Sequence, residues 1–155
     1  MARHTFAYIP FVFQPTAPFP SGQTVFRPYL GARLIAPNGN TFRCVVWPDS
    51  GADHCAFPLS FAIAMRIDPL QMRYHLTGGV GSTGNVTFYS DLTIEVGALG
   101  DPSADLTPIA SFTSYVGFTS GLEAQGLGLL GQSGFFEKHV VVFDHPAKQF
   151  HIDTI

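Results

Sequence analysis

The sequence predicts a single, mainly β domain with few and short helices. Its 155 residues fit one domain of ordinary size, and 46% of them are hydrophobic, which is enough for one core. Fifteen Phe favour the half-buried surface of strands, whereas sixteen Gly and twelve Pro favour turns and interrupt long helices. With only 12% charged residues, the composition excludes a disordered chain.

The charge balance argues against polyanionic partners. Eight Lys and Arg against eleven Asp and Glu give a formal charge of -3, so we expect neither nucleic acid nor a membrane as a partner. The apolar run at residues 6–13 is broken by Pro10 and is not a convincing export signal, which favours a cytoplasmic protein. Cys44 and Cys55 lack the spacing of a metal or redox site and are expected to be free thiols.

The first 28 residues are predicted to form an extended arm. Five prolines and several Phe lie in residues 1–28, which prevents a regular helix, and the segment has no steady alternation of apolar and polar residues. The rest of the chain, residues 29–155, forms the predicted domain.

Residues 29–36 and 41–47 are predicted to pair as a β-hairpin. The intervening Asn38-Gly39 tolerates the positive φ of a tight turn. The second strand ends at Trp47-Pro48, because proline has no N–H for a central strand. A polar turn at residues 49–53 therefore follows directly on a buried strand.

The remaining elements are short. A helix is predicted at residues 58–65, with Pro58 in its first turn, and a helical turn at residues 132–138. Further strands are expected at residues 72–76, 85–96, 109–118, 140–143 and 149–152. Four glycines between residues 77 and 84 predict a flexible hairpin tip between the first two of these strands.

Three motifs, in this order, resemble the retropepsin-like aspartic proteases. Asp49-Ser50-Gly51-Ala52 follows an apolar strand, the glycine-rich hairpin tip comes next, and Leu129-Leu130-Gly131 precedes a short turn near the C-terminus. The match covers residues 29–152, and residues 130–144 are similar to the bacterial members in particular. An Asp-Ser-Gly triplet alone also forms ordinary turns, so the resemblance depends on the ordered set.

The resemblance implies a β-barrel with a flap hairpin, and it implies roles for the residues of the three motifs. Asp49 is expected to be the catalytic acid and base, and Ser50 and Gly51 to hold the carboxylates in place. The substrate-binding residues implied in this way are Ala52, Asp53, Gly78, Gly79, Val80 and Gly81. Leu129, Leu130 and Gly131 are expected to pass beneath the active-site loop.

The chemistry of such a site requires two carboxyl groups. Peptide hydrolysis without metal or covalent intermediate needs one group to take a proton from water and another to polarise the carbonyl, and two carboxyls sharing one proton do both. This chain has one Asp-Ser-Gly, so the resemblance implies a homodimer in which Asp49 meets its copy. We expect an aspartic endopeptidase acting on polypeptides, with no cofactor and no metal.

Two departures from the family pattern keep an alternative open. Trp47-Pro48 replaces the usual aliphatic pair, and Gln132 stands where many retroviral relatives have an arginine that pairs with the carboxylate matching Asp53. These departures favour a non-catalytic retropepsin-like module for dimerisation or peptide binding. A small-ligand β-barrel unrelated to proteases is a third hypothesis. The arm could supply an interface, cover the groove or be removed by self-cleavage.

Other chemistries find less support. The six histidines are scattered without the spacing of metal ligands. A nucleophilic Cys55 would need a histidine and a third, orienting group that we cannot identify. Ser50 lacks the GxSxG pattern of hydrolase nucleophiles, and no Lys-Ser/Thr follows the glycines at 78–81 as a phosphate loop requires.

Overall fold

The computed structural model describes residues 1–78, 84–100 and 104–155, and strands predominate among them. The mainly β class is therefore confirmed. In chain order the elements are β1 (Ala2–Ala7), β2 (Ile9–Phe13), β3 (Gln23–Arg27), β4 (Leu30–Ile35), β5 (Thr41–Pro48), β6 (Ala56–Pro58), α1 (Leu59–Ala64), η1 (Pro69–Gln71), β7 (Arg73–Thr77), β8 (Asn85–Gly97), β9 (Pro108–Thr119), η2 (Ser120–Leu122), β10 (Gly128–Leu130), β11 (His139–Asp144) and β12 (Gln149–Thr154). In these described ranges no helix combines the length and the apolar composition needed to cross a membrane.

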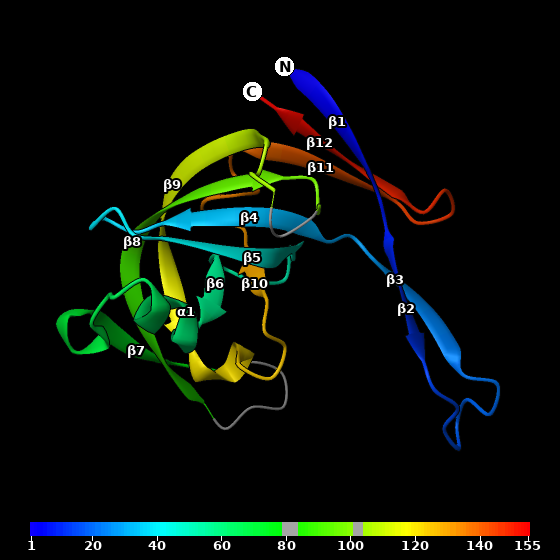
Figure 1. Cartoon of the computed structure of the whole chain (residues 1–155), viewed down its shortest axis with the longest axis horizontal. Coiled ribbons are helices and arrows are strands. Elements are labelled where there is room, and N and C mark those ends of the chain that lie inside the picture. The colour runs from blue at the N-terminus through cyan, green and yellow to red at the C-terminus, as the bar shows by residue number, and fades with distance from the viewer. Residues whose placement is uncertain (79–83, 101–103) are drawn as a thin grey trace.

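Six strands close into a barrel, as predicted. Their order is β4-β5-β10-β6-β9-β8, and β8 pairs again with β4, which closes the wall. β7 continues the sheet beyond β8 and forms a hairpin with it. Figure 1 shows the barrel with the hairpin of β7 and β8 at one end and the two chain termini at the other. Closure removes free strand edges from the wall of the barrel.

The barrel interior is apolar because side chains alternate between the two faces of each strand. The fully buried hydrophobic residues of the two strands that close the wall are Leu30, Ala32, Leu34, Leu92, Ile94 and Val96. Arg33 and Glu95 lie between them in sequence, point to the outer face and form an ion pair across β4 and β8. One pattern therefore provides the core and a charged outer surface.

The turn between β4 and β5 confirms the predicted hairpin. Gly39 has φ +83°, a conformation that favours glycine. The Asn38 side chain accepts a hydrogen bond from the Asn40 N–H at 2.9 Å and donates to the Met65 carbonyl at 3.0 Å. This second bond ties the turn to the end of α1, which itself matches the predicted helix and follows Pro58.

Residues 1–28 contain three strands. β2 and β3 form a hairpin that extends away from the barrel, and β1 pairs with β12 at the other end of the chain (Figure 1). Our expectation of no steady alternation was wrong for β1, where Arg3 and Thr5 are exposed and Phe6 stacks on Phe150 with centroids 5.2 Å apart. The partner strand lies about 150 positions away, so no local pattern identified it.

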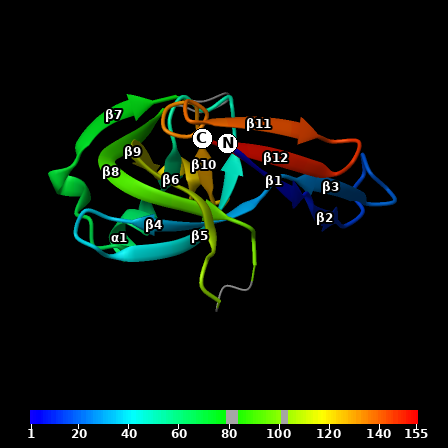
Figure 2. The same cartoon turned by 90° about the horizontal axis from the view of Figure 1, so that it is seen from above.

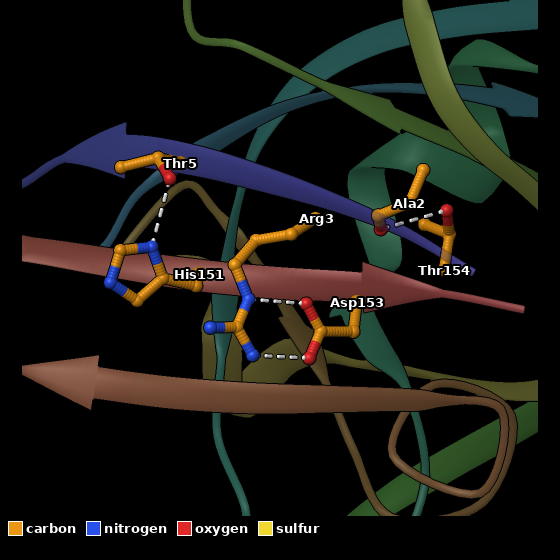
Figure 3. Close-up of polar contacts among 6 residues, drawn as sticks. All are labelled: Ala2, Arg3, Thr5, His151, Asp153 and Thr154. Atoms are coloured by element: carbon orange, nitrogen blue, oxygen red, sulfur yellow. Dashed lines mark hydrogen bonds and ion pairs between the residues drawn. The ribbon is translucent and has the colours of Figure 1, made fainter.

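β1, β12 and β11 form a separate three-stranded sheet beside the barrel (Figure 2). On its polar face Arg3 donates from Nε and Nη2 to the two carboxylate oxygens of Asp153, both at 2.7 Å (Figure 3). Thr5 Oγ1 lies 2.9 Å from His151 Nδ1 on the same face. The opposite face buries Phe150 and contributes to the core. This sheet fixes both termini to one another.

Two segments differ from the prediction. Residues 132–138 form successive turns instead of a helical turn, because Gly134 adopts φ +98° and a Cβ there would overlap the Ser114 side chain. The Phe136 N–H consequently reaches back five residues to the Gly131 carbonyl. Strand β6 was not predicted, because three residues are too short for a recognisable alternation.

Candidate active site

The turn at residues 49–53 leaves the barrel where β5 ends. The Asp49 N–H donates to the Leu130 carbonyl at 3.0 Å, which prolongs the parallel pairing of β5 and β10 beyond Pro48. Asp49 Oδ1 accepts from the Gly51 N–H at 2.9 Å, and the Asp49 carbonyl accepts from the Ala52 N–H at 3.1 Å. The half-buried carboxylate is thus oriented by its own turn, and its other oxygen has no hydrogen-bond partner among the described residues.

The tip of this turn is accessible from outside the molecule. Ser50 and Gly51 are both exposed. The Ser50 carbonyl accepts from Gln132 Nε2 at 2.8 Å. Sequence reasoning treated Gln132 only as a departure from the family pattern, whereas here its amide binds the turn across 82 positions of sequence. A glutamine thereby fastens the turn without an ion pair.

Strand β10 lies between β5 and β6 and brings Leu129-Leu130-Gly131 next to the turn. β10 runs parallel to β5 and antiparallel to β6, and its Leu130 is fully buried. A Cβ on Gly131 would overlap the His54 carbonyl and lie 2.8 Å from the Ala52 oxygen, so only glycine fits. The motifs at residues 49–53 and 129–131 therefore meet in the fold.

The chain after Gly131 continues this attachment. The Gln132 N–H donates to the Ala52 carbonyl at 2.8 Å, and the Ser133 N–H donates to the Asp53 carbonyl at 2.9 Å. Together with the Asp49 bond, these contacts hold both ends of the turn. Backbone groups, which do not depend on side-chain identity, make most of the attachment.

Two other predicted site residues, Asp53 and Gly78, make no side-chain contact with Asp49 among the contacts of the described residues. The Asp53 side chain is exposed, and its charge contributes, after burial and Tyr115, to raising the pKa of Tyr89. Gly78 is exposed at the end of the hairpin strand β7, and no hydrogen bond joins it to the 49–53 turn in the described part of the chain. Gly79, Val80 and Gly81 lie outside the described residues.

An apolar cavity of about 710 Å³ is lined by residues of the two strands that lead to the turn and to Gly131. Trp47 of β5 and Leu129 of β10, which pair across these strands, both line it. Trp47 lies two residues before Asp49, and a strand advances ~3.3 Å per residue, so the two backbone positions are roughly 7 Å apart. No described residue of the 49–53 turn lines this cavity or a second cavity of about 430 Å³.

Sequence reasoning missed the contribution of the arm to this cavity. Phe11 and Phe13 of β2 and Arg27 of β3 line its outer wall. The two phenylalanines are separated by one residue, so they lie on one face of β2, and this spacing was the signal available in the sequence. The prolines in the same segment led us to predict an extended arm instead of a strand with one apolar face.

Neither cysteine has the properties of a nucleophile. Burial raises the pKa of Cys44 to about 12 and the pKa of Cys55 to about 11, so both thiols are protonated near neutral pH. Both are free. Within the described ranges, no group of three or more His, Cys, Asp or Glu side chains is arranged to hold a metal ion.

Comparisons with known proteins give one distant likeness. No family model matches the sequence, and no curated protein matches it. The fold is similar to the crystal structure of a retropepsin-like aspartic protease from Rickettsia conorii, with a TM-score of 0.47 and 16% sequence identity over 98% of this chain and 95% of that chain. A likeness this distant assigns neither a family nor an activity.

Proposed function

We propose that the protein is an aspartic endopeptidase that acts as a homodimer, with Asp49 of each copy forming the catalytic carboxyl pair. The observation that carries this proposal is the meeting of the two motifs, in which the Asp49 N–H donates to the Leu130 carbonyl beside a Gly131 that tolerates no side chain. An ordinary Asp-Ser-Gly turn requires neither a distant strand nor a distant glycine. The sequence resemblance supplies the chemistry that this arrangement serves.

The need for a second copy follows from the count of carboxylates. Of the two aspartates in the 49–53 turn, only Asp49 belongs to the Asp-Ser-Gly motif, and the exposed Ser50 and Gly51 leave the tip of the turn open to a second molecule. A twofold axis through this tip brings the two Asp49 side chains together. Two adjacent carboxyls do not both ionise, so the pair holds one proton and titrates as a unit.

The proposed reaction uses both protonation states of the pair. The ionised carboxyl takes a proton from a water molecule, whose oxygen attacks the carbonyl carbon of the peptide bond, while the protonated carboxyl donates its proton to the carbonyl oxygen. When the tetrahedral intermediate collapses, the C–N bond breaks and the leaving amine takes the proton that came from water. The other carboxylate regains a proton from a hydroxyl of the intermediate, which restores the pair. The Gly51 N–H, which binds Asp49 Oδ1, keeps the carboxylate oriented during these steps.

The surroundings of Asp49 support an extended polypeptide as substrate. The apolar cavity beside Trp47 and Leu129 suits a large apolar side chain near the cleaved bond. The hairpin of β7 and β8 is the proposed flap, which closes over an extended peptide and excludes water.

A non-catalytic peptide-binding module is the second candidate. Gln132 and the backbone of residues 132–133 attach the turn through bonds within a single chain, and none of these bonds requires a partner copy. This module would share the fold and the cavity, and it differs from the peptidase only in lacking the carboxyl pair.

The experiment that separates the two candidates is a cleavage assay with a matched variant. Purified protein is incubated with a mixed peptide library at a series of pH values between about pH 4 and pH 7. Asp49→Asn should reduce cleavage about 1,000-fold or more. Asp105→Asn, which changes an exposed aspartate outside the site, should cleave like the wild type. Equal products from wild type and Asp49→Asn would remove Asp49 from the mechanism, and peptide binding without products would favour the module.

A further inference from the structure

Among the described residues, the cavity lined by Trp47 and Leu129 has a single charged side chain. Phe11, Phe13, Tyr29 and Trp47 supply aromatic walls, and leucines supply much of the rest. Arg27 is the only charged residue among the described residues that line this cavity. A ligand in this cavity therefore meets apolar surface and one fixed positive charge.

Four aromatic rings surround the Arg27 guanidinium. Its Cζ lies 5.3 Å from the ring centroids of Phe11 and Trp47 and 6.0 Å from those of Phe13 and Tyr29. Aromatic rings stabilise a guanidinium through its flat faces, whereas its N–H groups project in its plane. The rings therefore hold the guanidinium by its faces, and its N–H donors remain available to a hydrogen-bond acceptor that lies in the plane of the guanidinium.

Most of those donors have no partner in the described part of the chain. Arg27 Nη1 donates to the Tyr29 hydroxyl at 2.8 Å, and a guanidinium has five N–H groups. No carboxylate of the described residues forms an ion pair with Arg27. By contrast, Arg3 is paired with Asp153 and Arg33 with Glu95. The cation at the cavity differs from these two arginines in lacking a counter-charge.

This lack has a physical consequence for binding. A partly buried cation is costly unless it is paired, and a planar guanidinium pairs best with a carboxylate through two parallel hydrogen bonds. A carboxylate on a bound ligand would supply the missing partner, while the ligand's apolar part would occupy the aromatic walls. The charge of Arg27 and the apolar walls of the cavity thus both favour a ligand that combines a carboxylate with an apolar group.

We propose that Arg27 makes this cavity selective for peptides that carry a carboxylate beside large apolar side chains. The inference rests on the proposed function and adds the substrate class. Arg27 lies 5.3 Å from the Trp47 ring, and Trp47 precedes Asp49 by two residues, so the carboxylate belongs near the cleaved bond but not at it. Arg27 acts here as a specificity-determining residue that does not touch the reacting atoms.

The binding of such peptides can be observed without any cleavage. Trp47 is the single tryptophan of the chain, and its ring lies 5.3 Å from Arg27, so its fluorescence reports occupancy of the cavity. Three apolar peptides serve as probes: one amidated with an internal Glu, one identical but with Gln, and the Gln peptide with a free C-terminal carboxylate. The first and third distinguish an acidic side chain from a chain end as the source of the carboxylate.

The expected result is that at least one carboxylate peptide binds about tenfold more tightly than the amidated Gln peptide. Arg27→Met should abolish this preference, and Arg27→Lys should retain part of it. Arg43→Met is the matched control, because Arg43 donates to the Ala104 carbonyl and does not line this cavity. Dissociation constants are measured on the full-length Asp49→Asn chain, and kcat/KM on the wild type.

The outcomes separate this inference from the proposed function. If the Asp49→Asn chain that retains Arg27 binds all three peptides equally, or binds none of them, the proposed preference for a carboxylate is rejected. The preference is also rejected as a property of Arg27 if a folded Arg27→Met variant still shows it. Cleavage without any carboxylate preference keeps the peptidase and rejects the role of Arg27. A carboxylate preference in binding without cleavage keeps the role of Arg27 and rejects the peptidase.

Discussion

The turn at Asp49 and the cavity wall around Arg27 are neighbours that the fold holds in different ways. The turn is attached by backbone hydrogen bonds to β10 and residues 132–133, beside the irreplaceable Gly131. The outer part of the wall consists of Phe11, Phe13 and Arg27 from a hairpin that extends from the barrel (Figure 1). The position of the carboxylate therefore depends on the barrel itself, whereas the choice of ligand depends on a hairpin that barrel closure does not require.

The largest effect should come from breaking the attachment of the turn. Gly131→Ala places a Cβ against the His54 carbonyl, which has no room to move, and should lower the free energy of unfolding by about 3 kcal/mol while displacing the turn. Urea denaturation measures the loss. Gly100→Ala is the control, since nothing lies within 4 Å of the added Cβ. A Gly131→Ala protein as stable as the wild type would mean that β10 does not clamp the turn.

A change in the cavity wall should alter binding and leave the fold intact. Phe11→Ala removes a ring 5.3 Å from Arg27 and 5.2 Å from Tyr29, and should weaken peptide binding about five- to tenfold, as read from Trp47 fluorescence. Val12→Ala should bind normally, because Val12 is 74% exposed on the other face of β2. If Phe11→Ala unfolds the barrel, the contrast between turn and wall is incorrect.

Outside both regions, a buried histidine should make stability depend on pH. Both ring nitrogens of His139 are buried without a hydrogen-bond partner in the described residues, and the ring packs on Phe112 and Phe135. Burial, and then Lys138, lowers the pKa of His139 below its usual 6.5. The unfolded chain therefore binds more protons, and stability falls as the pH drops from about 6.5 through the folded pKa.

His139→Phe should remove this loss. We expect its Tm to exceed that of the wild type by about 3 °C at pH 5 and by less at pH 8, measured by calorimetry. His75→Phe changes an exposed histidine and should show no such pH-dependent gain. The same Tm difference at both pH values would show that His139 does not stay neutral in the fold.

The smallest effect concerns the sheet that joins the termini. The Arg3 guanidinium, through its hydrogen bonds, holds the pKa of Asp153 below its usual range (Figure 3). The stabilisation is therefore present above the unfolded pKa of about 3.9 and is lost as the pH falls through the folded pKa. Asp153→Asn should lower the Tm slightly at pH 7 and by less at pH 2. An equal decrease at both pH values would rule out a role for the ion pair.

Local signals in the sequence predicted much of the barrel. The Asn38-Gly39 turn identified the hairpin of β4 and β5, and the β-prone runs at residues 85–96 and 109–118 identified β8 and β9, because these signals lie within a few residues of one another. Pro58 likewise marked the start of α1. Each of these elements can be predicted from the sequence because its backbone conformation is favoured by residues that are close to one another along the chain.

What the sequence did not provide depends on distant partners. The pairing of β1 with β12 and the bond from Gln132 to the Ser50 carbonyl join positions 82 or more residues apart. Arg27 gave no signal as a cavity residue, since the rings around it come from β2, from Tyr29 just before β4 and from β5. Asp49 was identified only because a family resemblance connected its turn to Leu129-Leu130-Gly131.

The most direct measurement is a mixing experiment with wild type and Asp49→Asn chains. Equal amounts are allowed to exchange subunits at fixed total protein, and the rate of peptide cleavage is compared with that of wild type alone. If the site needs Asp49 from both copies, only about one quarter of the dimers are active and the rate falls to about one quarter. A rate of one half would contradict a carboxyl pair shared between chains.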